Sequence, residues 1–395
     1  MRFLKSVENQ TLFAIFLAVL GGLYFPEAVS KVTFLGDLFL RLLKMIIAPL
    51  ILASVYTSIS GLGSTSRVKD LGFKTLTYYF TTTSLAVFIG LVMVNLLHPG
   101  RGGNWFPEGA KIEVKGLTLK DLILGLIPEN PVKSLAEGDV LPIIFFALAF
   151  GLATLYLPPA RRKMLFDFFE ALNDAFITLI RGIVRFTPVG VFAIVAGIVV
   201  EKGLSPLFQL SSYVITVILG LFVHAVFILG GLLLFLGREN PWRFFLKVRE
   251  ALLVAFSTAS SSATLPISLE VAEEKAGIPK KVAGFVLPLG ATINMDGTAL
   301  YEVVAAMFIA NVYGISLGVG EQVLIFLTAT LASVGAAGIP SAGLVTMTLV
   351  LQAVGLPLEG IGLILAVDRF LDMMRTAVNV WGDLIGSKII SRFVS

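Results

Sequence analysis

Long apolar stretches separated by short polar ones follow one another along almost the whole chain. A helix needs about 20 apolar residues to cross a membrane. Stretches of that length or more occur near residues 8–26, 38–62, 71–98, 120–158 (broken), 168–200, 206–237, 278–312 and 358–392. Two others, at 243–270 and 318–356, are interrupted near their middles by small residues and a proline. The pattern predicts an all-α polytopic membrane protein.

Composition and charge agree with this prediction. Of 395 residues, 56% are apolar and only 14% are charged, whereas soluble domains are about 45–50% apolar and 25% charged. Basic residues gather in short segments between apolar stretches, at 67–69, 161–163, 238–249 and 275–281. The positive-inside rule makes these segments cytoplasmic. We expect a multi-pass protein of the cell inner (plasma) membrane with both termini in the cytoplasm.

Several other classes of site become improbable on composition alone. No soluble basic domain exists that could carry a nucleic-acid-binding patch, so no nucleic-acid partner is expected. The chain has no cysteine, which excludes disulfides and thiolate metal sites. The two histidines, His98 and His224, are far apart in sequence, and we interpret each as a packing or interface residue.

The two interrupted stretches have the same character. The first contains the serine-rich segment 257–266 and the second the glycine-rich segment 332–343. Small residues and proline disfavour a continuous helix, and non-helical backbone at membrane depth is tolerated only when it is buried or lines a cavity. Both are therefore candidates for re-entrant helical hairpins beside a transport site. The alternative is a pair of small-residue faces for helix packing.

The last stretch carries a polar stripe. A helix advances about 100° per residue, which places six polar side chains within about 100° of arc. They are Asp368, Asp372, Arg375, Thr376, Asn379 and Asp383. Each charge at the centre of a span costs about 2.5–3.5 kcal/mol, so such charges usually mark an ion or substrate path. A network of interhelical salt bridges is the alternative.

The residue types in this stripe suit a particular cargo. The planar guanidinium of Arg375 matches a carboxylate, and Asp372 with Asn379 can hold an ammonium group. Asn379 and Asp383 lie one turn apart and offer oxygen ligands to an alkali cation. An amino acid with a second carboxylate has both groups, a carboxylate for Arg375 and an ammonium group for Asp372 and Asn379.

A preceding span is interrupted at 290–302. Asn294 and Asp296 would lie on opposite faces of a regular helix, so a shared site requires unwinding there, with help from Gly297. Glu302 is a lone intramembrane carboxylate and a candidate proton carrier, with a structural hydrogen bond as the alternative. The hydroxyl-rich segment 78–84, taken alone, is more typical of side chains bonded to their own helix.

Together these residues resemble the dicarboxylate/amino acid:cation symporters, the glutamate transporter family. The resemblance covers essentially the whole chain. Its motifs are Ser260-Ser261-Ser262, Asn294-Met295-Asp296-Gly297-Thr298, Gly335-Ala336-Ala337-Gly338-Ile339-Pro340, and Asp372…Arg375-Thr376…Asn379…Asp383. Two departures stand at Ala259 and Met373, where archaeal and animal members, respectively, often carry arginine.

The resemblance implies an architecture. We expect eight transmembrane helices and two re-entrant hairpins with inverted repeats, assembled as a homotrimer in the lipid bilayer. Residues 1–70 and 101–204 would form a scaffold. Residues 71–100 and 205–395 would form a transport domain that moves like an elevator.

The resemblance also implies site residues. Substrate binding would fall to Arg375, Asp372, Thr376, Asn379, Thr298, Ser261, Ile339 and Gly343. Sodium sites would use Asp383, Asn379, Gly290, Asn294, Asp296, Tyr79, Thr82, Thr83, Thr292, Ser333 and Ala336. Glu302 stands where animal members couple protons and potassium.

The function expected is sodium-driven uptake of aspartate or glutamate, by a transporter and not an enzyme. The alternative within the same fold is a proton-coupled glutamate or C4-dicarboxylate symporter. An intramembrane aspartyl protease using Asp296 and Asp372 is disfavoured, because Arg375 and Asn379 should keep Asp372 ionised. A dedicated ion channel is a further alternative.

Overall fold

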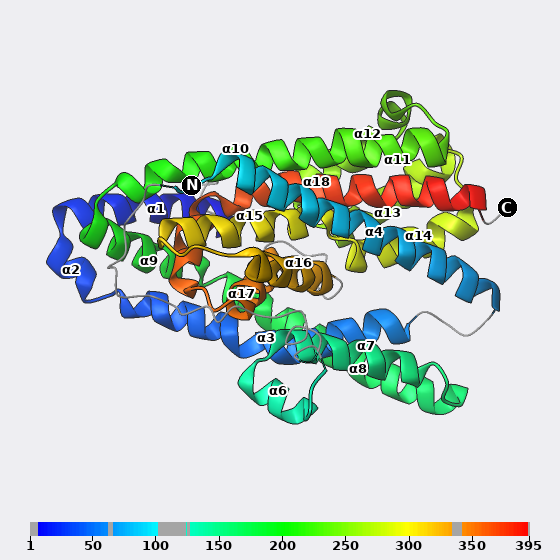
Figure 1. Cartoon of the computed structure of the whole chain (residues 1–395), viewed down its shortest axis with the longest axis horizontal. Coiled ribbons are helices and arrows are strands. Elements are labelled where there is room, and N and C mark those ends of the chain that lie inside the picture. Colours follow the sequence, from blue (N-terminus) through cyan, green and yellow to red (C-terminus); the bar gives the residue numbers. More distant parts are fainter. Residues whose placement is uncertain (1–6, 62–65, 102–123, 125–126, 334–341, 394–395) are drawn as a thin grey trace.

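The computed structural model describes residues 7–61, 66–101, 124, 127–333 and 342–393, and every regular element in these ranges is a helix. Figure 1 shows that most of the long helices run roughly along the longest axis of the molecule. The predicted all-α fold is therefore confirmed for this part of the chain.

The helices of the first half are α1 (Val7–Tyr24), α2 (Pro26–Ser30), α3 (Phe34–Ser60), α4 (Ser66–Leu97), α6 (Pro131–Glu137), α7 (Val140–Thr154), α8 (Pro159–Val184) and α9 (Thr187–Lys202). The second half continues with α10 (Ser205–Val223), η2 (His224–Leu229), α11 (Gly230–Leu232), η3 (Leu233–Gly237), α12 (Pro241–Thr258), α13 (Ser261–Glu270) and η4 (Val271–Lys275). It ends with α14 (Lys280–Ile293), α15 (Asp296–Val312), α16 (Val319–Ser333), α17 (Ala342–Ala353), η5 (Leu358–Gly360) and α18 (Ile361–Phe393).

The helices form two packed sets. In one set α1 packs on α9, and α3 packs on α7, α8 and α9. In the other, α18 packs against α10, α12, α14 and α15, while α4 lies against α10, α15 and α16. The sets meet where α18 touches α9 and α17 touches α3. Helix α18 is thus surrounded by its own set along much of its length.

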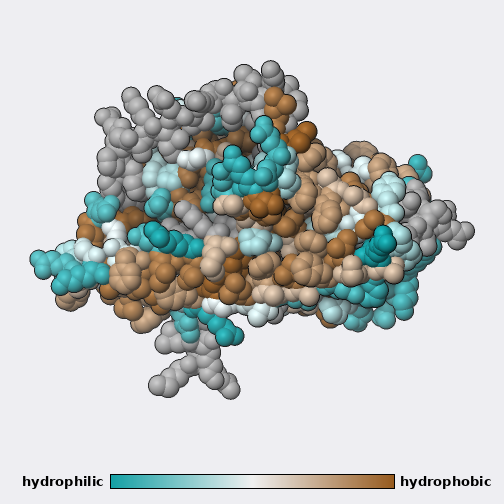
Figure 2. All heavy atoms as spheres, turned by 90° about the horizontal axis from the view of Figure 1, so that it is seen from below, coloured by the Kyte–Doolittle hydropathy of each residue, from teal (hydrophilic) through white to brown (hydrophobic). Residues whose placement is uncertain are grey.

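The surface is that of a membrane protein. By length and hydropathy, the stretches Leu71–Leu97, Leu210–Gly237 and Lys280–Val312 could cross a membrane, and a fourth span results if the bent pair Phe13–Tyr24 and Pro26–Phe39 is counted as one. Large apolar side chains face outward; Phe73 is 72% exposed and Phe235 77%. Figure 2 shows apolar residues over much of the middle of one face, with hydrophilic residues gathered towards both ends.

One predicted span is wrong as a single helix. The stretch 168–200 is divided between α8 and α9, which are separated by a turn at Arg185 and Phe186. Pro188 lies in the first turn of α9, where its missing N–H removes no helical hydrogen bond and its fixed φ suits a helix start. The proline therefore begins a new helix at this point.

The first interrupted stretch is a pair of helices, α12 and α13, that pack on each other. Ala259 ends α12 with φ +49°, a left-handed conformation, and Ser260 caps α13 by accepting a hydrogen bond from the Ala263 N–H at 3.2 Å. Pro266 lies inside α13, so the proline does not make the break. The turn expected in the second interrupted stretch falls within 334–341, outside the described residues, although α16 and α17 do pack together.

The predicted unwinding near residue 294 is confirmed. Helix α14 ends at Ile293, Asn294 is extended (φ −89°, ψ 98°), and α15 begins at Asp296. This short break lets Asn294 and Asp296 reach one region from what would otherwise be opposite helix faces.

Candidate functional site

The polar stripe of α18 faces the protein interior. Arg375 is fully buried, and the other five members are between 2% and 4% exposed. On the opposite side Phe370 is 50% exposed. The arc predicted from helical periodicity therefore coincides with the buried face.

Arg375 lies among two carboxylates and an aromatic ring. Its Nε donates to Asp372 Oδ1 at 3.0 Å, and its Nη1 donates to Asp368 Oδ1 at 3.1 Å. The guanidinium carbon lies 4.1 Å from the centroid of the Tyr301 ring, and the Tyr301 hydroxyl donates to Asp368 Oδ1 at 2.7 Å. We call these four residues the Arg375 cluster. They tie α18 to α15, and their formal charges sum to −1.

One guanidinium nitrogen in this cluster is underused. Nη2 lies 3.0 Å from Asp372 Oδ1 but makes no hydrogen bond in the described structure. The backbone of α17 comes close on the same side, because a Cβ at Gly343 would lie 2.9 Å from Arg375 Cζ. A side chain at this position would require the guanidinium to shift. A buried guanidinium whose Nη2 has no hydrogen-bond acceptor can donate to a further carboxylate.

Asn379 connects α18 to the start of α15. Its Oδ1 accepts the Gly297 N–H at 2.7 Å, and its Nδ2 lies 3.4 Å from Thr298 Oγ1 and 3.2 Å from Met295 Sδ. Gly297 allows this close approach; a Cβ there would lie 2.5 Å from the Arg375 carbonyl oxygen. Gly297 was expected to help unwinding, but it lies within α15, and its lack of a side chain matters for packing.

The remaining predicted substrate residues do not contact the Arg375 cluster through any hydrogen bond between described residues. Ser261 and Thr376 are buried, at 3% and 4% exposure, and α13 packs on α18. Among the described residues, no hydrogen bond joins either hydroxyl to the Arg375 cluster. Ile339, the predicted gate residue, and Ala336, a predicted sodium ligand, lie outside the described part of the chain.

A second group of oxygens surrounds the break between α14 and α15. Asn294 Nδ2 donates to Asp383 Oδ1 at 2.9 Å and approaches the Asn379 carbonyl at 3.4 Å. Asn294 Oδ1 is buried and has no hydrogen-bond partner among the described residues. Gly290 abuts the same place, since a Cβ there would overlap both Asp383 Oδ1 and the Tyr79 hydroxyl. An unsatisfied buried acceptor beside a carboxylate suits a cation.

Asp296 completes this group from the first residue of α15. Its Oδ1 accepts from Thr83 at 2.7 Å and from Thr82 at 3.3 Å, and its Oδ2 lies 3.0 Å from His224 Nε2. Segment 78–84, which taken alone is typical of side chains bonded to their own helix, thus sends the hydroxyls of Thr82 and Thr83 to Asp296. We call Tyr79, Thr82, Thr83, Asn294, Asp296 and Asp383 the Asp296–Asp383 cluster.

The second predicted sodium site is not assembled by described contacts. Thr292 is exposed and its hydroxyl donates to Leu289 O at 2.9 Å. Ser333 is buried and donates to Thr330 O at 2.7 Å. Both hydroxyls bond to their own helices, and no hydrogen bond between described residues joins them. Their predicted role was through backbone carbonyls and stays a prediction.

Glu302 is fully buried and bridges two helices. Thr346 of α17 donates a short hydrogen bond to Glu302 Oε1, while Oε2 has no hydrogen-bond partner among described residues. The structural partner weighed as an alternative therefore exists, and the second oxygen still has room for a proton.

Sequence reasoning missed three contributors, namely His224, Tyr301 and the pairing of Asp368 with Arg375. His224 is fully buried at the start of the π-helical segment η2, a geometry often found at functional sites. The signal was available: an ionisable residue within an apolar span usually has a specific partner, and this rule applies to histidine as well as to aspartate.

The two clusters can hold an anionic cargo and monovalent cations. No group of three or more His, Cys, Asp or Glu side chains that could hold a metal ion occurs among the described residues. Around the break the acceptors are instead carboxylate, amide and hydroxyl oxygens. Hard oxygen ligands with few charges favour alkali cations over transition metals.

Comparison with known proteins identifies the family. Human excitatory amino acid transporter 2 is 39% identical over 96% of this chain and 77% of its own length. Excitatory amino acid transporter 1 of Ambystoma tigrinum is 39% identical over 91% of this chain and 76% of its own. The putative sodium-dependent excitatory amino acid transporter glt-4 of Caenorhabditis elegans is 40% identical over 92% and 83%. The sodium:dicarboxylate symporter family profile matches residues 8–393, and the chain belongs to this family.

Proposed function

We propose that this protein is a secondary active symporter that couples inward sodium movement to the uptake of aspartate or glutamate. The observation that carries the proposal is the fully buried Arg375, held by two carboxylates on one face of α18, whose Nη2 makes no hydrogen bond among the described residues. Relatives named as excitatory amino acid transporters support the same class of cargo.

The charges explain why cations should accompany the cargo. The Arg375 cluster has a formal charge of −1, from Asp368 and Asp372 against Arg375. Asp296 and Asp383 add −2. An acidic amino acid brings a further net −1 into this buried region. Burying uncompensated charge is strongly unfavourable, so sodium ions that neutralise the carboxylates would bind together with the cargo.

Each group in the Arg375 cluster would have one role. Arg375 would bind the side-chain carboxylate of the cargo through Nη2, and Asp372 would bind its ammonium group. Thr376 and Asn379 would contact the main-chain carboxylate. Thr298, Ser261 and Gly343 would complete the pocket, with Ile339 at the gate.

Sodium would bind around the break. One ion would use Asp383, Asn379 and carbonyls near Gly290 and Asn294. Another would use the side chains of Asn294, Asp296, Tyr79, Thr82 and Thr83. A third site, from carbonyls near Thr292, Ser333 and Ala336, is proposed on the resemblance alone.

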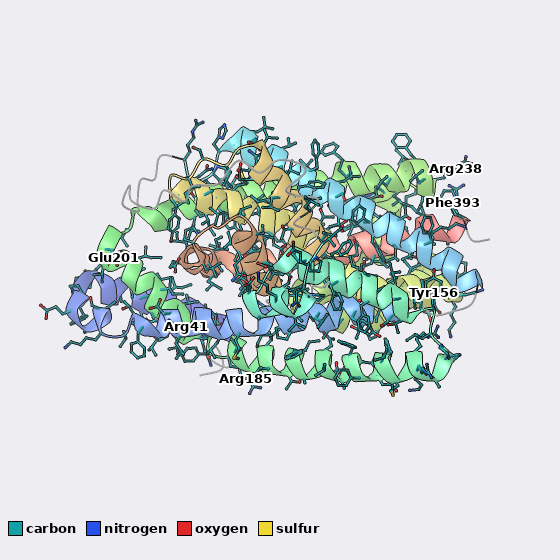
Figure 3. All side chains as sticks on the ribbon, turned by 60° about the horizontal axis from the view of Figure 1, so that its bottom comes forward. Arg41, Tyr156, Arg185, Glu201, Arg238 and Phe393 are labelled. Atoms are coloured by element: carbon teal, nitrogen blue, oxygen red, sulfur yellow. The ribbon has the colours of Figure 1, made fainter. Side chains whose placement is uncertain are left out.

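The proposed architecture is a homotrimer of elevator type. Residues 1–70 and 101–204 would form the scaffold, and residues 71–100 and 205–395 the moving domain with eight spans and two re-entrant hairpins in total. The separate packing of the two helix sets supports this division. Figure 3 shows Arg238, Tyr156 and Phe393 towards one end of the molecule and Glu201 towards the other. The end with Arg238 and Phe393 would be cytoplasmic in an inner (plasma) membrane, because basic loops face the cytoplasm.

A second candidate is proton-coupled transport of glutamate or a C4-dicarboxylate by the same fold. The observation that favours it is the buried Glu302, whose Oε2 has no hydrogen-bond partner among described residues. Proton and potassium coupling could also accompany sodium in one cycle.

Uptake into proteoliposomes tests these proposals. Labelled aspartate and glutamate would be supplied while sodium, proton and potassium gradients are imposed one at a time. We expect accumulation above equilibrium only with an inward sodium gradient. Accumulation driven by protons alone would replace the proposal with the second candidate, and binding that sodium leaves unchanged would reject it.

A further inference from the structure

An open apolar groove lies outside the two clusters. It has a volume of about 670 Å³ and lies between η2 with α11, the helix α12, and the middle of α18. Apolar side chains make up most of its walls, including Phe245, Leu252, Phe256, Val378 and Trp381. In Figure 1, α11 and α12 lie on the side of the molecule away from α3 and α8. A groove of this size and composition suits an acyl chain.

One charged residue, Arg249, interrupts the apolar wall. Trp242, Phe245, Arg249, Leu252 and Phe256 follow one face of α12 at spacings of three, four and seven residues, as expected for a helical stripe. Arg249 is exposed, and no hydrogen bond or ion pair joins it to another described side chain, although the neighbouring Glu250 lies within range of its charge. A guanidinium keeps its charge in any environment that a protein offers.

Two charged residues of α12 close to Arg249, namely Lys247 and Glu250, are already paired. Lys247 donates to Glu239 at 2.5 Å, and Lys275 donates to Glu250 at 2.6 Å. Glu250 therefore gives its hydrogen bond to Lys275 and interacts with Arg249 only through its charge, so the N–H groups of Arg249 are available to an external anion. A lone guanidinium beside an apolar groove matches a molecule with an apolar tail and an anionic head.

We propose that this groove binds a phospholipid with an anionic headgroup, whose phosphate contacts Arg249 and one of whose acyl chains lies along Leu252 and Phe256. Basic pockets between transmembrane helices on the cytoplasmic side bind such headgroups. Trp242, 67% exposed and stacked on Phe245 with ring centroids 5.5 Å apart, is an interfacial aromatic anchor. Leu253 lies at the rim of the groove and is 64% exposed. The second acyl chain would pass this residue and remain in the bilayer.

The position of the groove gives the lipid a means of acting on the transport site. Ala377 and Val378 line the groove and stand between Thr376 and Asn379 on α18. The opposite wall, α12, leads directly to the turn at Ala259 and Ser260. A bound lipid would hold α12 against α18 and so restrain the mouth of the first helix pair.

Fluorescence quenching by brominated lipids tests the proposal. The chain has three tryptophans, so Trp105→Phe with Trp242→Phe, which keeps an aromatic ring at the anchor position, leaves Trp381 in the groove wall as the only fluorophore. This protein would be reconstituted with phosphatidylglycerol or phosphatidylcholine brominated on one acyl chain. One arginine near a membrane surface favours anionic lipid about fivefold. We expect half-maximal quenching at a mole fraction of phosphatidylglycerol about fivefold lower than that of phosphatidylcholine.

Two variants and a control make the result decisive. Arg249→Gln should remove the preference for phosphatidylglycerol, whereas Arg243→Gln, the same change on another face of α12, should retain it. Gly230→Leu, which extends a side chain towards Pro241 at the groove wall, should reduce quenching by both lipids. Equal quenching by the two lipids, or a preference that survives Arg249→Gln, would overturn the proposal. The proposal would also be overturned if a brominated fatty acid quenched Trp381 and phosphatidylglycerol could not displace it.

Discussion

Replacing Gly290 by alanine would push one methyl group into the proposed cation site. The new Cβ would overlap both Asp383 Oδ1 and the Tyr79 hydroxyl. Neither group can withdraw freely, because Asp383 accepts from Asn294 at 2.9 Å and Tyr79 donates to Val286 O at 2.8 Å. Overpacking of this kind costs about 1–3 kcal/mol. Since the displaced atoms are proposed to face sodium, we expect sodium affinity about 5- to 150-fold weaker.

Gly284→Ala is a matched control on the same helix. A Cβ at Gly284 would have no atom of another described segment within 4 Å, so this change adds a methyl group without a clash. Both substitutions gain about 0.5–1 kcal/mol from the better helix propensity of alanine. The difference between the two variants therefore isolates the steric effect at Asp383 and Tyr79.

The assay is calorimetric titration of aspartate at a series of sodium concentrations, with melting temperatures measured on the same samples. We expect Gly290→Ala to need more sodium for the same aspartate affinity and to approach wild-type affinity when sodium saturates. Gly284→Ala should follow the wild-type curve. If Gly290→Ala retains the wild-type sodium dependence, the cation site does not lie where Asp383, Tyr79 and Gly290 meet.

Three further predictions concern single charges. Arg375→Cys removes a charge-assisted contact worth about 3 kcal/mol, so aspartate binding should weaken about a hundredfold while neutral amino acids compete better; unchanged aspartate affinity would refute the assignment. Glu302→Gln can still accept the hydrogen bond from Thr346, so the fold should persist, and uptake should lose its pH and potassium dependence; wild-type dependence would exclude Glu302 as the proton carrier. Burial favours a higher pKa for Glu239, but hydrogen bonds from Lys247 and Lys388 outweigh it and lower the pKa. That stabilisation is present above the unfolded pKa and is lost as pH falls through the folded one, so the melting temperature of Glu239→Gln should approach that of wild type in acid; a constant gap between them would contradict this.

The stripe on α18 could be predicted from sequence because its information is local. Helical periodicity alone places Asp372, Arg375 and Asn379 on one face, and the cost of charge in a membrane turns that face inward. The break at Asn294 could be predicted for a similar reason, since two polar residues at a spacing of two cannot share a site on a regular helix.

The contacts between helices could not be predicted in this way. Nothing in the spacing of α18 indicates that Tyr301 of α15 stacks on Arg375, or that His224 reaches Asp296 across a sequence separation of 72. The roles of the glycines could not be predicted from the sequence either. A glycine that permits unwinding and one that permits close packing look alike in sequence, and the distance from Gly297 to Arg375 distinguishes them only in the fold.

Asn379 has a consequence for how cargo and ions depend on each other. Its side chain reaches Gly297 and Thr298 near the Arg375 cluster, while its carbonyl faces Asn294 of the other cluster. Any ligand that reorients this residue changes the free energy of binding at both places. Thermodynamic linkage then requires reciprocity: the factor by which sodium tightens aspartate must equal the factor by which aspartate tightens sodium. Two independent titrations of the same sample must therefore yield one coupling constant.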